Sequence, residues 1–193
     1  MKLDNILKDV LKLKNEKTIR LLKDNAVLRF LKKEEMLIRQ DEVQSYVTLL
    51  IRGGVKCYSI LENGKVFMNY LEARSGVPIV SGGEENNTPA MMSVETIADS
   101  EILQIPKKIM SQLMDQQLEH MINKWLTCFL NECRELRQCW CLPTTERYLW
   151  LVRTKPEILP VASQKDIAQL LNMTPQRLSV IRHKLKQEGY EIS

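Results

Sequence analysis

Long apolar runs are missing from this 193-residue sequence, and their absence limits where the protein can reside. The longest plainly apolar stretch, residues 47–51, is far shorter than the roughly 20 residues that cross a bilayer. Charged residues repeatedly interrupt the N-terminal segment MKLDNILKDVLKLK, so no signal-peptide core can form there. We therefore expect a cytoplasmic protein that does not associate with membranes.

Histidine is scarce, and the motifs of common catalytic sites are missing. The two histidines, His120 and His183, have no plausible nucleophile or set of metal ligands beside them in the sequence. No glycine-rich loop that could hold phosphates and no nucleophile elbow is present. The sequence therefore predicts a protein that is not an enzyme and that needs no cofactor.

Cysteine is present, but in a number and spacing that do not suggest a disulfide framework. The five cysteines form an odd set without a secretory context. Four of them crowd one predicted helix, where residues 128, 133 and 139 project at different angles and cannot converge on one ion. We expect buried, reduced thiols without a metal, and a redox switch or a metal site are the alternatives. The cysteines are Cys57, Cys128, Cys133, Cys139 and Cys141.

Short β-branched and aliphatic runs between about Ala26 and Pro106 predict a β-rich domain. Hydrophobic residues make up 44% of the chain, which is enough for real cores. Asn63-Gly64, between two of the runs, is a strong signal for a hairpin with a type I′ turn. Six or more short strands predict a small barrel or sandwich, preceded by an amphipathic helix over residues 3–14. The runs cover residues 36–38, 46–51, 55–61, 66–71, 93–98 and 101–105.

The pattern after Pro106 is helical and continues to about Trp140. Apolar residues recur there at intervals of three or four and form one stripe of about six turns. A helix of that length usually buries such a seam against a partner, so we expect a dimer interface. In a parallel dimer, Cys133 would approach its own copy. The predicted interface residues are Leu118, Ile122, Trp125, Phe129, Cys133 and Leu136.

The last thirty residues carry the most specific signals. Ser163 can cap a helix that has Asp166 at its third position. Thr174 can cap a second helix that has Pro175 at its first position, where a missing N–H is harmless. Between the two helices, Asn172 lies at a sharp turn, and asparagine tolerates the left-handed conformation. A short helix, a tight turn and a second helix predict a helix-turn-helix.

The outward side of the second helix is polar and basic. Residues 174–188 contain four lysines and arginines but one acidic residue, and the whole chain has a formal charge of +4. Such a surface fits the major groove of DNA, whereas a solvated helical hairpin is the plainer alternative. Because the caps, the turn residue and the inner apolar positions coincide, we expect double-stranded DNA as the partner.

Three upstream stretches have a pattern that matches one family. They are FLKKEEMLIRQDE from Phe30, LIRGGVKCY from Leu50 with Asn63-Gly64-Lys65 after it, and SVETIADSEILQIP from Ser93. With the helix-turn-helix, they make nearly the whole chain resemble the Crp/Fnr family of bacterial transcription regulators. The resemblance implies a homodimeric regulator that has an unidentified small-molecule effector and that contacts RNA polymerase.

The same resemblance implies an α+β fold in three parts. Residues 1–106 are expected to form an N-terminal helix and a β-roll (jelly-roll) sensor domain. Residues 107–142 are expected to form a long dimerisation helix, and residues 143–193 a winged helix-turn-helix DNA-binding domain. The chain ends soon after Gly189, where relatives continue into a β-hairpin wing. We therefore expect little or no wing.

By analogy with the family, side chains around the second helix meet DNA in two ways. One group is expected near base edges and the other near phosphates. Two positions depart from the family pattern. Many members carry a base-reading arginine where this chain has Val180, and Pro175 replaces a residue that often contacts DNA, so we expect an unusual target sequence. The predicted set is Gln176, Arg177, Ser179, Val180 and His183 near bases, Thr174 and Arg182 near phosphates, and in addition Ser163 and Lys184.

The resemblance also provides a test for cyclic-nucleotide binding. The family's ligand cassette needs a Gly-Glu pair and, about ten residues later, an arginine that meets the phosphate. Val80 and Ala90 occupy the positions of the glutamate and the arginine. A shifted alignment could use Gly83-Glu84, but no arginine occurs between Arg74 and Arg134. We expect no binding of cyclic AMP and a polar loop over residues 82–87, either an effector site or plain surface.

A second hypothesis, which gives the chain a function of a different class, remains open. The chain could be a ligand-binding or protein-interaction module whose C-terminal unit contacts protein and not DNA. Salt dependence separates the two readings, because binding driven by phosphate contacts weakens steeply as salt rises.

Overall fold

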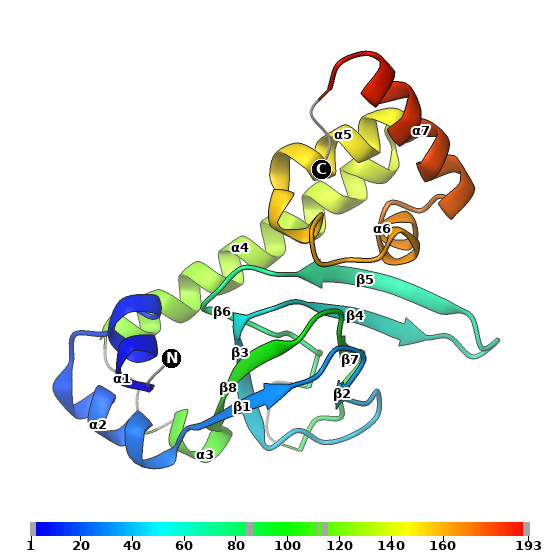
Figure 1. Cartoon of the computed structure of the whole chain (residues 1–193). Coiled ribbons are helices and arrows are strands. Elements are labelled where there is room, and N and C mark those ends of the chain that lie inside the picture. Colours follow the sequence, from blue (N-terminus) through cyan, green and yellow to red (C-terminus); the bar gives the residue numbers. More distant parts are fainter. Residues whose placement is uncertain (1–2, 84–86, 111, 113–115, 191–193) are drawn as a thin grey trace.

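Two antiparallel four-stranded sheets form the β-roll at the centre of the computed structural model, which describes residues 3–83, 87–110, 112 and 116–190. The strand orders are β1-β8-β3-β6 and β2-β7-β4-β5. The fold is therefore α+β, as predicted, with helices at both ends of the roll (Figure 1). The strands are β1 (Val27–Leu31), β2 (Met36–Ile38), β3 (Tyr46–Arg52), β4 (Val55–Ile60), β5 (Val66–Glu72), β6 (Val77–Pro78), β7 (Ser93–Thr96) and β8 (Ser100–Pro106).

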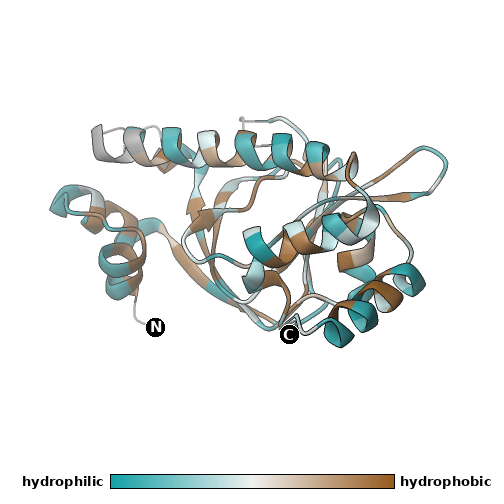
Figure 2. Ribbon diagram, turned by 90° about the horizontal axis from the view of Figure 1, so that it is seen from above, coloured by the Kyte–Doolittle hydropathy of each residue, from teal (hydrophilic) through white to brown (hydrophobic). Residues whose placement is uncertain are grey.

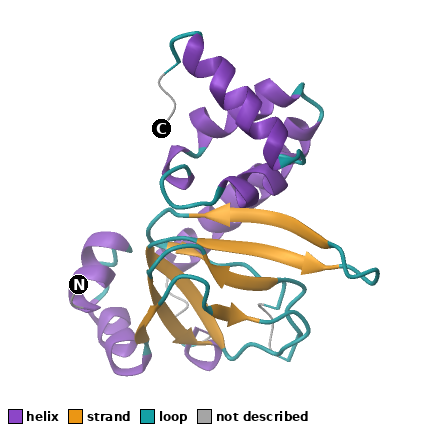
Figure 3. Ribbon diagram, turned by 45° about the vertical axis from the view of Figure 1, so that its right-hand side comes forward, coloured by secondary structure: helices purple, strands orange, loops and turns teal. Residues whose placement is uncertain are grey.

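The helical segments precede and follow the roll. Figure 3 shows the C-terminal helices stacked above β5. No helix among the described residues combines the length and the apolarity needed to span a bilayer. The segments are α1 (Leu3–Asn5), η1 (Ile6–Val10), α2 (Glu16–Asn25), α3 (Lys107–Met110), α4 (Gln116–Trp140), α5 (Thr144–Thr154), η2 (Pro156–Ile158), α6 (Gln164–Leu170) and α7 (Pro175–Gln187).

The N-terminal segment forms a shorter helical stretch than predicted. Helical structure ends at Val10, and Lys12 adopts a positive φ of 56° where a helix over residues 3–14 would have continued. Ile6 and Leu7 are fully buried in a core with strands β3 and β8. Tertiary packing of these two residues, and not the amphipathic pattern of a surface helix, therefore determines the conformation of this segment.

The hairpin between β4 and β5 is confirmed, but the type I′ turn is wrong. Gly64 has a φ of +75°, whereas Asn63 is not among the residues with positive φ, and a type I′ turn needs positive φ at both central residues. The Gly64 N–H donates to the Leu61 carbonyl at 2.8 Å, and the Leu61 N–H donates to the Lys65 carbonyl at 2.9 Å. Gly64 therefore belongs to a loop longer than the two-residue loop of a type I′ hairpin, and the extra residue of this loop follows the turn.

The apolar stripe of α4 lies mainly against its own chain. Trp125 packs against the core under β3 and β8, and the rings of Phe129 and Tyr70 meet edge-to-face at 6.0 Å. Leu136 is buried in a core that includes residues of β5 and of the C-terminal helices. Figure 2 shows both teal and brown residues along α4, which runs beside the roll. The stripe therefore does not by itself require a partner.

One apolar core joins the roll to the C-terminal unit, defined here as residues 143–190. It contains Met68 and Leu71 of β5, Ile97 of the roll and the buried residues of α5, α6 and α7. The loop before α6 also approaches the roll closely, because a Cβ atom added at Gly54 would lie 3.3 Å from Val161 Cγ2. The C-terminal unit is therefore docked on the roll and not tethered by a linker alone.

Candidate nucleic-acid interface

The two helices of the helix-turn-helix begin where the sequence predicts. The Ser163 hydroxyl accepts from the Asp166 N–H at 3.1 Å and donates to its carboxylate at 2.5 Å. The Thr174 hydroxyl accepts from the Arg177 N–H at 3.2 Å, and Pro175 opens α7. Each cap satisfies a backbone donor that the helix itself leaves free.

The turn between α6 and α7 has the predicted backbone conformation. Asn172 adopts φ of +50°, and its N–H donates to the Gln169 carbonyl at 3.1 Å. The inner residues of both helices are buried together with Tyr148 and Leu151 of α5. Ala168 is fully buried in this core, where its small side chain allows α6 and α7 to pack closely. The inner residues are Ile167, Ala168, Leu170, Leu171, Leu178, Ile181 and Leu185.

Arg147 of α5 holds the turn from behind, a role that sequence reasoning missed. Its guanidinium donates to the carbonyls of Leu171 at 3.1 Å and Asn172 at 3.0 Å. It also donates to the Leu142 carbonyl at the end of α4 at 2.8 Å. These oxygens lie at helix ends, where intrahelical donors run out. One cation therefore ties the turn to the C-terminal end of α4.

The outward side of α7 is accessible over its full length (Figure 1). Arg182 is half-buried, and the remaining predicted DNA-contacting residues are exposed. Several already have neighbours. The Arg177 guanidinium donates to the Thr144 hydroxyl at 3.1 Å, Lys184 lies 3.7 Å from the Glu188 carboxylate, and His183 contacts Gln187 at 2.9 Å. Exposed contacts of this kind are weak and exchange readily for phosphate or base contacts.

The surface of α7 can therefore enter a groove without rearrangement of the core. The exposed face combines hydrogen-bonding side chains with lysine and arginine, and Val180 offers an apolar surface in its middle. Phosphates attract the cations, and base edges suit amide, hydroxyl and guanidinium groups. The geometry has what a groove-reading helix needs, although the assignment of each side chain stays a prediction.

Comparisons with known proteins agree with this architecture. Residues 28–117 match the profile of the cyclic nucleotide-binding domain family. No curated protein sequence is significantly similar to the chain. FixK2 from Bradyrhizobium japonicum superposes with a TM-score of 0.74 at 18% identity, over 87% of this chain and 89% of its own. CLP from Xanthomonas campestris, a c-di-GMP responsive global regulator, gives a TM-score of 0.69 at 16% identity, over 91% of this chain and 93% of its own.

A third structure extends the agreement to another organism. The CRP-family transcriptional regulator TTHB099 from Thermus thermophilus gives a TM-score of 0.66 at 13% identity, over 83% of this chain and 85% of its own. The chain has the Crp/Fnr fold. The fold that the sequence resemblance implies is thereby confirmed.

The ligand cassette of the Crp/Fnr fold is filled by apolar and neutral side chains in this chain. Ala90, at the arginine position, is 1% exposed and packs with Cys57 in the roll core. The Tyr70 hydroxyl donates to the Val80 carbonyl at 2.6 Å and accepts from the Val80 N–H at 2.8 Å. Neither cassette position offers a charge for a phosphate. Residues 84–86 of the predicted polar loop lie outside the described residues.

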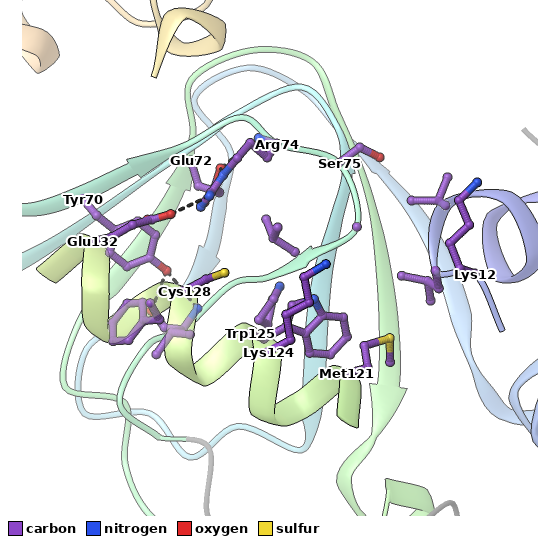
Figure 4. A pocket seen from close by; sticks show the side chains of 17 residues that line it. Lys12, Tyr70, Glu72, Arg74, Ser75, Met121, Lys124, Trp125, Cys128 and Glu132 are labelled. Atoms are coloured by element: carbon purple, nitrogen blue, oxygen red, sulfur yellow. Dashed lines mark hydrogen bonds and ion pairs between the residues drawn. The ribbon is translucent and has the colours of Figure 1, made fainter. Parts of the chain in front are cut away.

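A cavity of about 410 Å³ lies between the roll and α4 (Figure 4), and Val80, at the glutamate position of the cassette, is one of its lining residues. Its walls come from residues 10–12, from the segment that leads from β5 to β6, and from the side of α4 between Met121 and Glu132. Aromatic and aliphatic side chains line it beside the charged side chains of Lys12, Glu72, Arg74, Lys124 and Glu132. Its size is in the range of small-molecule sites.

The cysteines fall into two classes. Cys57 and Cys139 are buried, and burial raises the pKa of the Cys139 thiol to about 11. Cys128 and Cys141 are exposed, so the expectation of buried thiols is wrong for these two. Burial also raises the pKa of the half-buried Cys133. The described residues contain no group of three or more histidine, cysteine or acidic side chains that could hold a metal ion.

Replacing Arg147 with methionine should destabilise the turn, because three carbonyl oxygens at helix ends lose their donor. We expect Arg147→Met to lower the free energy of unfolding by about 2 kcal/mol, as measured by urea denaturation. Arg153→Met removes an exposed guanidinium of the same helix that has no described hydrogen-bond partner, and it should leave the midpoint unchanged. Equal midpoints for the two variants would contradict the role of Arg147.

Cyclic AMP should not stabilise the protein, because Val80 and Ala90 offer no partner for its ribose and phosphate. Saturating ligand at a hundred times its Kd would add about 2.7 kcal/mol of stability. We expect no change in Tm in a thermal-shift titration, with a Crp/Fnr protein that has an intact Gly-Glu and arginine cassette as the positive control. A rise in Tm that grows with the concentration of cyclic AMP would contradict this prediction.

Proposed function

We propose that this protein is a sequence-specific DNA-binding transcription regulator of the Crp/Fnr type that acts as a homodimer. The observation that carries the proposal is the exposed, basic face of α7, held rigidly by two side-chain caps and by Arg147. The Crp/Fnr fold of the whole chain supports it, since FixK2, CLP and TTHB099 share the arrangement of roll, long helix and C-terminal helices. Catalysis has no part in the proposal.

The contacts with DNA divide into two kinds by position and charge. Gln176, Arg177 and Ser179 lie in the first turns of α7, the part of a recognition helix that reaches deepest into the major groove. Arg182 and Lys184 lie further along, where a cation can meet the phosphate backbone. Val180 contributes an apolar contact, for example with a thymine methyl. We assign base reading to the first group and affinity to the second.

Dimerisation is assigned to a stripe of α4 beside the one that the sequence predicts. Leu126 and Leu130 are 54% and 59% exposed, and their spacing of four places them on one face of the helix. Ile122 and Cys133 flank this face, and Ile122 also packs partly against the core under β3 and β8. Trp125, Phe129 and Leu136 turn toward the chain's own roll and cores. The side chain of Leu118 lies outside the described residues. A second copy of α4 would cover the two leucines.

The effector of the proposed regulator is assigned to the cavity between the roll and α4, which Val80 of the cassette also lines. Its walls belong to the sensor part and to the proposed dimerisation helix, so an occupant would touch both. The identity of the occupant is not part of the proposal.

Selection of bound genomic fragments by the purified protein tests the proposed function. We expect a specific fragment whose affinity falls by at least about a hundredfold between 50 and 200 mM salt. Gln176→Ala should reduce discrimination between the specific and a scrambled fragment by about 1–3 kcal/mol. Lys184→Ala should weaken binding to both and reduce the slope of log affinity against log salt by about 1. Fluorescence anisotropy measures each constant.

Lys65→Ala is the matched control for these variants, because Lys65 is an exposed lysine on the β4–β5 hairpin, remote from α7 along the chain. It should leave affinity and salt dependence unchanged. If no fragment binds even at low salt, DNA contact by α7 must be abandoned in favour of a protein-interaction module.

Leu130→Glu should disrupt the homodimer, because it places a charge in the centre of the proposed interface. We expect sedimentation equilibrium to show a dimer for the natural chain and a shift toward monomer of at least about tenfold in dissociation constant for the variant. Asn131→Glu, at an exposed neighbouring position off the stripe, is the control and should remain dimeric. Identical masses for both variants would exclude this face.

A further inference from the structure

Five charged side chains from three parts of the chain meet in one cluster, called here the ion cluster. Glu72 ends β5, and Arg74 follows it in the roll. Glu132 lies in the middle of α4, Lys155 directly follows α5, and Glu157 lies in η2. The cluster thus joins the roll, the long helix and the C-terminal unit.

Glu132 is the member that connects the two sides. One carboxylate oxygen lies 2.5 Å from Arg74 Nη1, and the other accepts from Lys155 Nζ at 2.9 Å. Arg74 in turn donates to Glu72 at 2.5 Å and lies 4.0 Å from the Glu157 carboxylate. Figure 4 shows Arg74 and Glu132 pointing toward each other across the upper wall of the cavity.

Burial makes these contacts consequential. The side chains of Glu72 and Lys155 are 5% and 10% exposed, and buried charges of this kind need their partners. Burial alone would raise the pKa of Glu72, but hydrogen bonds from Arg74 and the charges of Lys155 and Arg74 lower it below its ordinary value. The Glu72 carboxylate therefore stays charged, and separating these buried side chains from their partners carries a substantial cost in free energy.

From this geometry we infer that Glu132 is a positioning residue for DNA binding: it fixes the angle of the C-terminal unit on the roll by pairing with Arg74 and Lys155 at once. The inference rests on the proposed function. The apolar core that also joins the two parts is non-directional, so it resists separation more than it resists sliding. Two ion pairs of defined geometry on opposite oxygens of one carboxylate resist sliding.

The position of the ion cluster relative to α7 explains why such an angle matters. Lys155 lies at the start of the connection from α5 to α6, and α6 leads directly into α7. In a homodimer two recognition helices must meet two half-sites about one helical turn of DNA apart. A small rotation of the C-terminal unit produces a larger displacement along α7, so it changes how both recognition helices fit their half-sites.

The ion cluster also has a built-in imbalance. It holds three carboxylates against two cations, and one buried oxygen of Glu157 has no hydrogen-bond partner among the described residues. Arg74 is the group that all three carboxylates approach. Because Glu72, Arg74 and Glu132 also line the cavity, an occupant of the cavity would reach the same joint.

Neutralising Glu132 in the full chain tests the inference. Glu132→Gln keeps the size of the side chain and removes its charge, and Lys155→Met keeps the length of its partner. We expect each single variant to bind the selected DNA fragment about tenfold more weakly than the natural chain does. The affinity of the double variant should be no lower than that of the single variant with the lower affinity. Lys155→Arg keeps the cation and should bind as the natural chain does. Glu135→Gln, one turn further along α4 and without a described ion pair, is the control.

A second measurement, made without DNA, tests the joint between the roll and the C-terminal unit directly. Amide hydrogen exchange should rise in α6 and in β5, which pack against each other, for Glu132→Gln but not for Glu135→Gln. Circular dichroism checks that every variant is folded. Natural affinity for DNA, or unchanged exchange, in folded Glu132→Gln would overturn the inference. If the natural chain binds no DNA, the proposed function fails, and because the inference concerns DNA binding it falls as well, whatever the exchange shows of the joint.

Discussion

The burial of apolar side chains between β5 and the C-terminal helices is the constraint on which the rest of the structure depends. Met68 and Leu71 of the roll share one core with Leu136 of α4 and with the inner residues of α6 and α7. Because these side chains come from all three parts of the chain, the core sets where the basic helix lies. The caps, Arg147 and the ion cluster then refine a position that apolar packing has already chosen.

Directional contacts fix the orientation of the helices, which the apolar core does not. Trp140 donates its indole N–H to the Leu170 carbonyl at 2.8 Å, and its ring meets that of Phe67 edge-to-face at 5.7 Å. Arg147 and Glu132 add charged hydrogen bonds. Each of these residues joins two elements that are distant in sequence. Hydrogen bonds with narrow angular preferences can orient a helix in a way that contact between aliphatic groups cannot.

Local signals in the sequence were sufficient for the helix-turn-helix. Ser163, Asn172 and Thr174 act within four residues of their own position, so their roles follow from backbone chemistry and survive any tertiary context. Arg147 and Glu132 were not found, because their partners lie 23 to 25 residues away or further and only the folded chain brings them together. The overall α+β fold was predicted through the family resemblance.

Intermediate signals were only partly informative. Asn63-Gly64 marked the hairpin correctly, but loop length decided the turn type, and composition alone does not reveal where the extra residue falls. Periodicity predicts a dimer interface along the seam of α4, because it shows that a face is apolar without showing what covers it. The roll covers much of this seam, and the two exposed leucines lie beside it. Those leucines are spaced like the rest of the helix, so accessibility was the missing information.

The shared core has a consequence for how the molecule comes apart. When two parts of a chain bury the same side chains, neither can melt while the other remains intact without exposing them to water. The roll and the C-terminal helices therefore form a single cooperative unit, and in a fragment cut after the roll α6 would lose its packing against β5.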